Sequence, residues 1–88
     1  MSYKICVVGA GYWGKNHIRT LHELGALGGI VDSDEHSLEL SLRKYEGLNG
    51  YLNIDEALIG DYDGYTIATP AETHYKLAKK VILAKKHV

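Results

Sequence analysis

Short apolar runs alternate along the chain with segments whose apolar residues recur at helical spacing. Strands are expected at about residues 3–8, 29–31, 50–52 and 64–68. Helices are expected at about 12–24, from Ser33 or Asp34 to Tyr45, from Asn53 to Ile59, and from Ala71 or Glu72 to Lys86. Strict alternation of strand and helix predicts a parallel sheet with right-handed crossovers and helices on both faces.

The predicted architecture is a partial, Rossmann-type doubly wound α/β fold of three layers, with strand order 3-2-1-4. Leu38, Leu42 and Tyr45 recur at i, i+4 and i+7 in the second helix, and Asn53 with Glu56 is typical of a capped helix start. In such sheets, ligands bind at the carboxyl ends of the strands, where the strand order reverses. Here that point lies between the first and fourth strands.

A glycine-rich turn follows the first strand and opens the first helix. Its sequence, Gly9-Ala10-Gly11-Tyr12-Trp13-Gly14, has the spacing G-x-G-x-x-G. The first glycine permits the tight turn, the second lets backbone approach a pyrophosphate, and the third lets the helix pack close to the strand. The helix start then offers free N–H groups to phosphate, those of Tyr12 and Trp13 included.

Asp32 ends the second strand, where its carboxylate can accept hydrogen bonds from the ribose hydroxyls of the adenosine; Ser33 beside it belongs to the same predicted site. Two alternatives remain for the turn: an adenosine site of the methyltransferase type and a glycine turn that binds nothing. The full three-glycine spacing favours a dinucleotide. Because Asp32 would repel a 2′-phosphate, the predicted cofactor is NAD rather than NADP.

Two motifs carry a family resemblance. Gly9-x-Gly11-x-x-Gly14-x-x-His17-x-x-x-Leu21 resembles the opening of the glucose-fructose oxidoreductase, inositol dehydrogenase and MocA family, and residues 68–74 resemble its A-T-P-x-x-x-H segment. The resemblance covers essentially the whole chain. It implies that Thr69 and Pro70 lie beside the nicotinamide ribose, and we expect His74 to orient the cleft. Residues 11–16 are also similar to the branch that oxidises UDP-N-acetylglucosamine derivatives.

The resemblance further implies a fifth strand with an E-K-P motif and a substrate domain, neither of which lies within residues 1–88. The chain is therefore expected to be a dinucleotide-binding domain truncated before strand five, inactive alone. In a full-length protein, hydride would pass between nicotinamide and a sugar, nucleotide sugar or cyclitol. The alternatives are a regulatory module that senses NAD without turnover and a fragment that binds nothing.

Composition narrows the partners and the setting. A formal net charge of −1 offers no reason to expect binding to nucleic acid or to an anionic membrane. Cys6 is the single cysteine and is expected to be buried in the first strand. A single cysteine cannot form an intramolecular disulfide, which fits a reducing, cytoplasmic setting. No metal-ligand spacing is present. The last helix holds five of the ten basic residues, interpreted as a solvated face. We also expect a homo-oligomer, formed through the edge of the fourth strand or the last helix.

Overall fold

The fold is a four-stranded parallel sheet. The computed structural model describes residues 4–9, 12–60, 62–69, 71–84, 86 and 88, and for 12, 13, 71 and 72 it describes the backbone alone. From edge to edge the strands are β3 (Asn49–Tyr51), β2 (Leu27–Val31), β1 (Ile5–Val8) and β4 (Gly64–Ile67). In the register, Val8 of β1 lies beside Val31 of β2 and Ile67 of β4. The predicted strand order 3-2-1-4 is confirmed.

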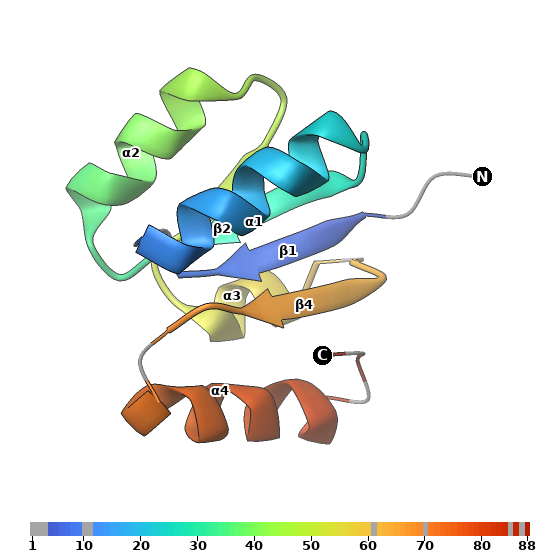
Figure 1. Cartoon of the computed structure of the whole chain (residues 1–88). Coiled ribbons are helices and arrows are strands. Elements are labelled where there is room, and N and C mark those ends of the chain that lie inside the picture. The colour runs from blue at the N-terminus through green and yellow to red at the C-terminus, as the bar shows by residue number, and fades with distance from the viewer. Residues whose placement is uncertain (1–3, 10–11, 61, 70, 85, 87) are drawn as a thin grey trace.

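Two helices cover each face of the sheet (Figure 1). The first pair is α1 (Tyr12–Glu23) and α2 (Glu35–Lys44), and the second pair is α3 (Ile54–Leu58) and α4 (Ala71–Leu83). Each crossover therefore returns the chain to a parallel strand, and the expected three layers are present. The carboxyl ends of β1 and β4 lie side by side at one edge of the sheet, as the reversal of strand order requires.

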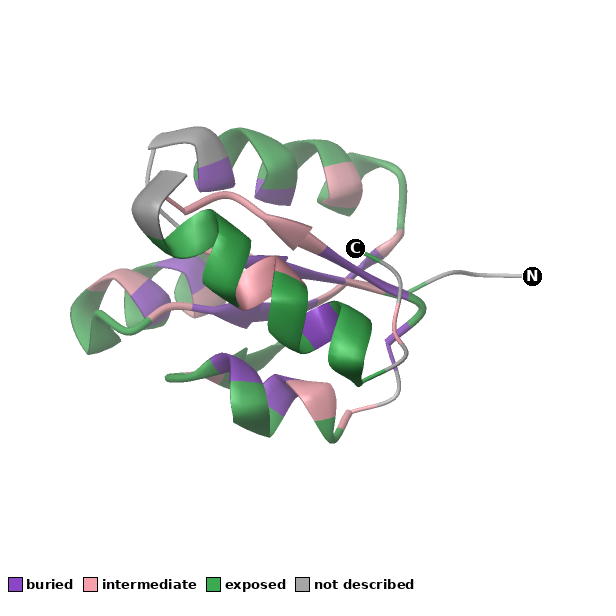
Figure 2. Ribbon diagram, turned by 90° about the horizontal axis from the view of Figure 1, so that it is seen from below, coloured by how far each residue is buried: buried purple, intermediate pink, exposed green. Residues whose placement is uncertain are grey.

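Alternating residues of β1 divide the core into two clusters. Val7 packs toward α1 and α2, in the cluster that contains Ile18 and Leu38. Cys6 and Val8 face the other way, in the cluster with residues from α3 and α4. Figure 2 shows the buried strands between helices whose outer sides are exposed. Burial of Cys6 is confirmed, and removal from water raises the pKa of its thiol to about 12.

Tyr62 explains why β2 contains two adjacent glycines. A Cβ atom on Gly29 would lie 2.5 Å from the Tyr62 hydroxyl oxygen, and one on Gly28 would lie 3.0 Å from the ring. The Tyr62 hydroxyl is 2.8 Å from that of Tyr51, and burial raises the pKa of Tyr62. The glycines thus make room for an aromatic ring. The strand continues through them and begins at Leu27, two residues before its predicted start.

The helix boundaries follow their capping groups. Asp34, one of the two predicted caps, caps α2, and Asn53 caps α3. The end predicted for the last helix, at Lys86, is wrong: α4 ends at Leu83. There the backbone N–H of Lys86 donates to the carbonyl oxygen of Val81 at 3.1 Å, a five-residue span typical of a terminating helix.

Candidate functional site

The turn after β1 leaves no space for side chains at two of its glycines. Gly9 has φ +100°, a conformation that glycine adopts without strain. A Cβ atom on Gly9 would lie 2.9 Å from the carbonyl oxygen of Ala68, and one on Gly14 would lie 1.8 Å from that of Gly9. The start of α1 therefore packs directly on the turn, and the turn packs on the end of β4. Gly11 lies outside the described residues, and so do the side chains of Tyr12 and Trp13.

The end of β2 presents acidic and hydroxyl groups in a fixed loop. The backbone N–H of Asp32 donates to Tyr51 at 3.0 Å, and its Oδ1 accepts from the N–H of Asp34 at 2.9 Å. Asp34 in turn accepts from the N–H of His36 at 3.1 Å and from the Ser37 hydroxyl at 3.1 Å. The Ser37 hydroxyl, followed by neighbouring backbone N–H groups, lowers the pKa of the Asp34 carboxyl. The loop thus holds two aspartates at the carboxyl end of the sheet, and its hydrogen bonds favour the ionised form of the Asp34 carboxyl.

The end of β4 contributes a buried hydroxyl. The N–H of Ala68 donates to Val8 at 2.8 Å, so the backbone here follows β1 one residue beyond the strand. Within the described residues, Thr69 Oγ1 is the buried side-chain oxygen that has no hydrogen-bond partner. A buried hydroxyl without a partner is costly, so this atom is suited to a ligand that donates or accepts there. Pro70 lies outside the described residues.

One cavity of about 700 Å³ collects these groups. Among the predicted site residues that the structure describes, four are in its wall: Gly9, Asp32, Ser33 and Thr69. The rest of the wall comes from the strand ends and from α2, α3 and α4. It consists of Val8, Val31, Asp34, Ser37, Leu52, Asn53, Ile54, Asp55, Ala68, Thr73, Lys76, Leu77 and Lys80. The dimensions lie within the range of small-molecule and cofactor sites.

The structure does not bring His74 to this wall. Its side chain is exposed, and the neighbouring positions of α4 that do line the cavity are Thr73 and Lys76. The helical period accounts for this, because a residue one position away from an inward-facing side chain points about 100° around the axis. Contact of His74 with a cofactor remains a prediction that this wall does not support.

Two lysines of α4 were missed as site residues. Lys76 and Lys80 line the cavity, and Lys80 Nζ lies 3.2 Å from Oδ2 of Asp55 on α3. The solvated-face interpretation is therefore incomplete for these two side chains. The available signal was that Lys76 and Lys80 lie one helical turn apart, on the side of the helix that also holds Leu77. The sequence alone did not indicate that α3 lies opposite them. Groups of ligating side chains that could hold a metal ion are absent from the described part of the chain.

A family comparison identifies this arrangement. The model of an oxidoreductase family with an NAD-binding Rossmann fold matches residues 3–88. The chain belongs to this family. Membership confirms the resemblance to glucose-fructose oxidoreductase and its relatives, the fold class, and NAD as the cofactor of the domain. A search of curated proteins finds no match.

Solved structures resemble the chain over nearly all its residues. WlbA dehydrogenase from Bordetella pertussis, in complex with NADH and UDP-GlcNAcA, is 28% identical over 100% of this chain, with a TM-score of 0.91. GenD2 from gentamicin A biosynthesis, in complex with NAD, is 31% identical over 97%, with a TM-score of 0.86. A probable dehydrogenase from Thermotoga maritima is 27% identical over 97%, with a TM-score of 0.89. This chain spans 28%, 25% and 26% of their respective lengths.

Among the described residues, no helix is both long and apolar enough to cross a membrane.

Proposed function

We propose that the cavity at the carboxyl edge of the sheet binds NAD, with the pyrophosphate at the turn of Gly9 and Gly11 and the adenosine ribose at Asp32. The observation that carries the proposal is the meeting of Gly9, Asp32 and Thr69 in one cavity wall. These residues come from the ends of three different strands. Such convergence at the switch point of a doubly wound sheet is typical of a dinucleotide site.

The residues fit the chemistry of the cofactor. Gly9 presents backbone where a side chain has no room, and α1 begins just beyond the turn with N–H groups that favour an anion. Asp32 is partly exposed at the cavity and can accept from ribose hydroxyls. The unpartnered hydroxyl of Thr69 supplies a further hydrogen-bonding group near the turn. We assign Ser33 to the adenosine side and Pro70 to the Thr69 side of the site.

We further propose that residues 1–88 are the dinucleotide-binding part of a dehydrogenase of sugars, nucleotide sugars or cyclitols. Gly9, Asp32 and Thr69 would hold NAD, which would supply the acceptor for a hydride from the hydroxyl carbon of the substrate. This chain's contribution is to bind and orient the cofactor and to exclude water from its apolar surroundings. WlbA is a relative whose structure holds UDP-GlcNAcA, which supports a nucleotide sugar as one candidate substrate. Because the chain covers 28% of that protein, we assign turnover to a longer protein.

Isothermal titration of the 88-residue chain with NAD tests the cofactor site. We expect saturable binding that is lost in Gly11→Val, because the added side chain would occupy the space of the pyrophosphate. A Gly11→Val variant that keeps its circular dichroism spectrum and still binds NAD normally would place the phosphate site elsewhere. Turnover of nucleotide sugars by the purified chain would contradict the assignment of activity to a longer protein, and binding without turnover in that longer protein would favour the sensing module.

We also propose that the chain self-associates through α4 and the edge of β4. Strand β4 pairs with β1 on one side and ends the sheet. On α4, Tyr75, Ile82 and Leu83 are exposed apolar side chains. Edges and apolar surfaces of this kind recruit other chains. Sedimentation velocity over a concentration series should show association that Ile82→Lys reduces, and a monomer at all concentrations would contradict it.

A further inference from the structure

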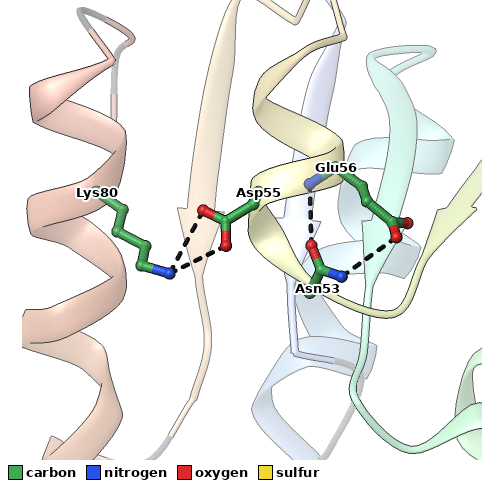
Figure 3. A network of polar contacts seen from close by, with 4 residues as sticks. All are labelled: Asn53, Asp55, Glu56 and Lys80. Atoms are coloured by element: carbon green, nitrogen blue, oxygen red, sulfur yellow. Dashed lines mark hydrogen bonds and ion pairs between the residues drawn. The ribbon is translucent and has the colours of Figure 1, made fainter.

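One ion pair between two helices lies in the cavity wall, and both of its side chains are partly exposed to solvent. Lys80 Nζ on α4 lies 3.2 Å from Asp55 Oδ2 and 3.4 Å from Asp55 Oδ1 on α3 (Figure 3). The two residues are 25 positions apart in the sequence, and both line the cavity. We call this ion pair the clasp.

Asp55 is held in place by the cap of its short helix. Asn53 Oδ1 accepts from the backbone N–H of Glu56 at 3.0 Å, and Asn53 Nδ2 donates to Glu56 Oε1 at 3.2 Å. These bonds fix the first turn of α3, where a carboxylate is also favoured by the helix dipole. Beneath the clasp, Ile54 and Val81 are buried in the same core cluster. The clasp therefore joins the solvent-exposed sides of two helices whose inner sides are already packed in one cluster.

The clasp lies on the adenosine side of the cavity if the proposed function holds. The chain around Asn53 follows β3, whose residue Tyr51 accepts the backbone hydrogen bond of Asp32 at 3.0 Å. The start of α3 is thus tied to the acid that would bind the adenosine ribose. We propose that Asp55 and Lys80 are positioning residues that hold α3 and α4 at the separation needed by the adenine base, without touching the reacting end of the cofactor. This proposal rests on the proposed function.

The clasp hypothesis and simple charge attraction predict opposite changes in NAD affinity for Asp55→Asn. Asp55→Asn removes a negative charge, so attraction alone would tighten the binding of anionic NAD, whereas Lys80→Met would weaken it. If the pair acts as a clasp, both variants weaken binding in the same direction, and the double variant is no weaker than either single one. The side chains of Lys80 and Asp55 are 47% and 69% exposed, which limits the expected change to about threefold, a size common for exposed ion pairs.

The test uses the 88-residue chain, with NAD, AMP and nicotinamide mononucleotide titrated separately by NMR. We expect Asp55→Asn and Lys80→Met each to raise the dissociation constants of NAD and AMP about threefold and to leave that of nicotinamide mononucleotide unchanged. The exchanged variant, Asp55→Lys with Lys80→Asp, should restore AMP affinity. Lys76→Met is the matched control, because it removes a cavity-lining lysine for which the structure gives no ion pair within its described residues.

The outcomes separate the two proposals. If the parent chain binds neither NAD nor AMP, the proposed function fails and the clasp fails with it. If the parent binds but Asp55→Asn tightens AMP, or leaves it unchanged, the clasp alone is overturned. Equal losses for AMP and nicotinamide mononucleotide, with a lower melting temperature, would show general destabilisation and would also overturn it.

Discussion

In the cavity, the wall at the end of β1 consists of backbone, whereas the wall formed by α3 and α4 consists of side chains. At the first wall, Gly9 and the residue that packs on it, Gly14, are so close to neighbouring backbone that an added Cβ would overlap it. At the second wall, Asp55 of α3 and Lys80 of α4 form an ion pair whose side chains remain 69% and 47% exposed. The first wall is thus rigid and intolerant of substitution, and the second is adjustable.

The difference reflects the tasks proposed for the two walls. Phosphate is recognised by N–H groups and by the end of a helix, which every sequence can supply if the backbone approaches closely enough. A base ring is enclosed by shape and by apolar contact, which depend on side chains such as Leu52 and Leu77. Substitutions in the backbone wall should therefore affect folding and binding together, while those in the side-chain wall should change affinity alone.

The largest effect is expected for Gly14→Ala. The new Cβ would lie 1.8 Å from the carbonyl oxygen of Gly9, and backbone must move to relieve the clash. We expect the free energy of unfolding to fall by more than about 3 kcal/mol. For a domain this small, such a loss is enough to leave most molecules unfolded. Thermal denaturation followed by circular dichroism measures it. Gly25→Ala is the control: with φ +71° and no atom within 4 Å, it should cost about 1–2 kcal/mol. Equal losses of unfolding free energy in the two variants would contradict the close packing of Gly14 on the backbone of Gly9.

Cofactor selectivity should follow from Asp32. NAD is expected to bind at least about tenfold more tightly than NADP, a difference of about 1.4 kcal/mol, because a 2′-phosphate would approach the carboxylate. Lys76 and Lys80 line the same cavity and would moderate the repulsion. Calorimetric titration with both cofactors gives the ratio, and Asp32→Asn should reduce it. NADP binding as tight as NAD would refute the role of Asp32.

Thr69 lies where the two walls meet and allows a finer test. Thr69→Val removes the unpartnered hydroxyl with little change in shape. We expect NAD affinity to fall about fivefold, close to the 1 kcal/mol of a typical hydrogen bond, while the free energy of unfolding stays the same or rises. Thr69→Ser, which keeps the hydroxyl, should retain affinity. A Thr69→Val variant that loses stability and keeps affinity would show that the hydroxyl serves the fold.

The smallest effect on stability at neutral pH is expected for Cys6, a buried residue of β1. Burial raises the pKa of its thiol from 9.0 to about 12. The folded state therefore holds this proton more strongly than the unfolded state, so stability is unaffected below pH 9 and falls as the pH rises from 9 toward 12. Urea denaturation at pH 8, 9 and 10 should show this slope, and Cys6→Ala should have a shallower one. Parallel slopes in the two proteins would contradict it.

The sequence alone determined the layered fold and the cofactor class, because these depend on periodicity and on glycine spacing within short segments. The strand order could be predicted because the alternation of strand and helix after a glycine-rich first turn is typical of the doubly wound fold, whose strand order is known. Asp34 and Asn53 as caps belong to the same group, since a cap acts within three or four residues. The tertiary structure alone decided what depends on contacts between distant segments. It extended β2 back to Leu27 and Gly28, it filled the space beside Gly28 and Gly29 with the ring of Tyr62, and it turned His74 away from the cavity. It also brought Lys80 to Asp55 across 25 residues, a meeting that no local pattern encodes because it depends on how α3 and α4 pack against one sheet.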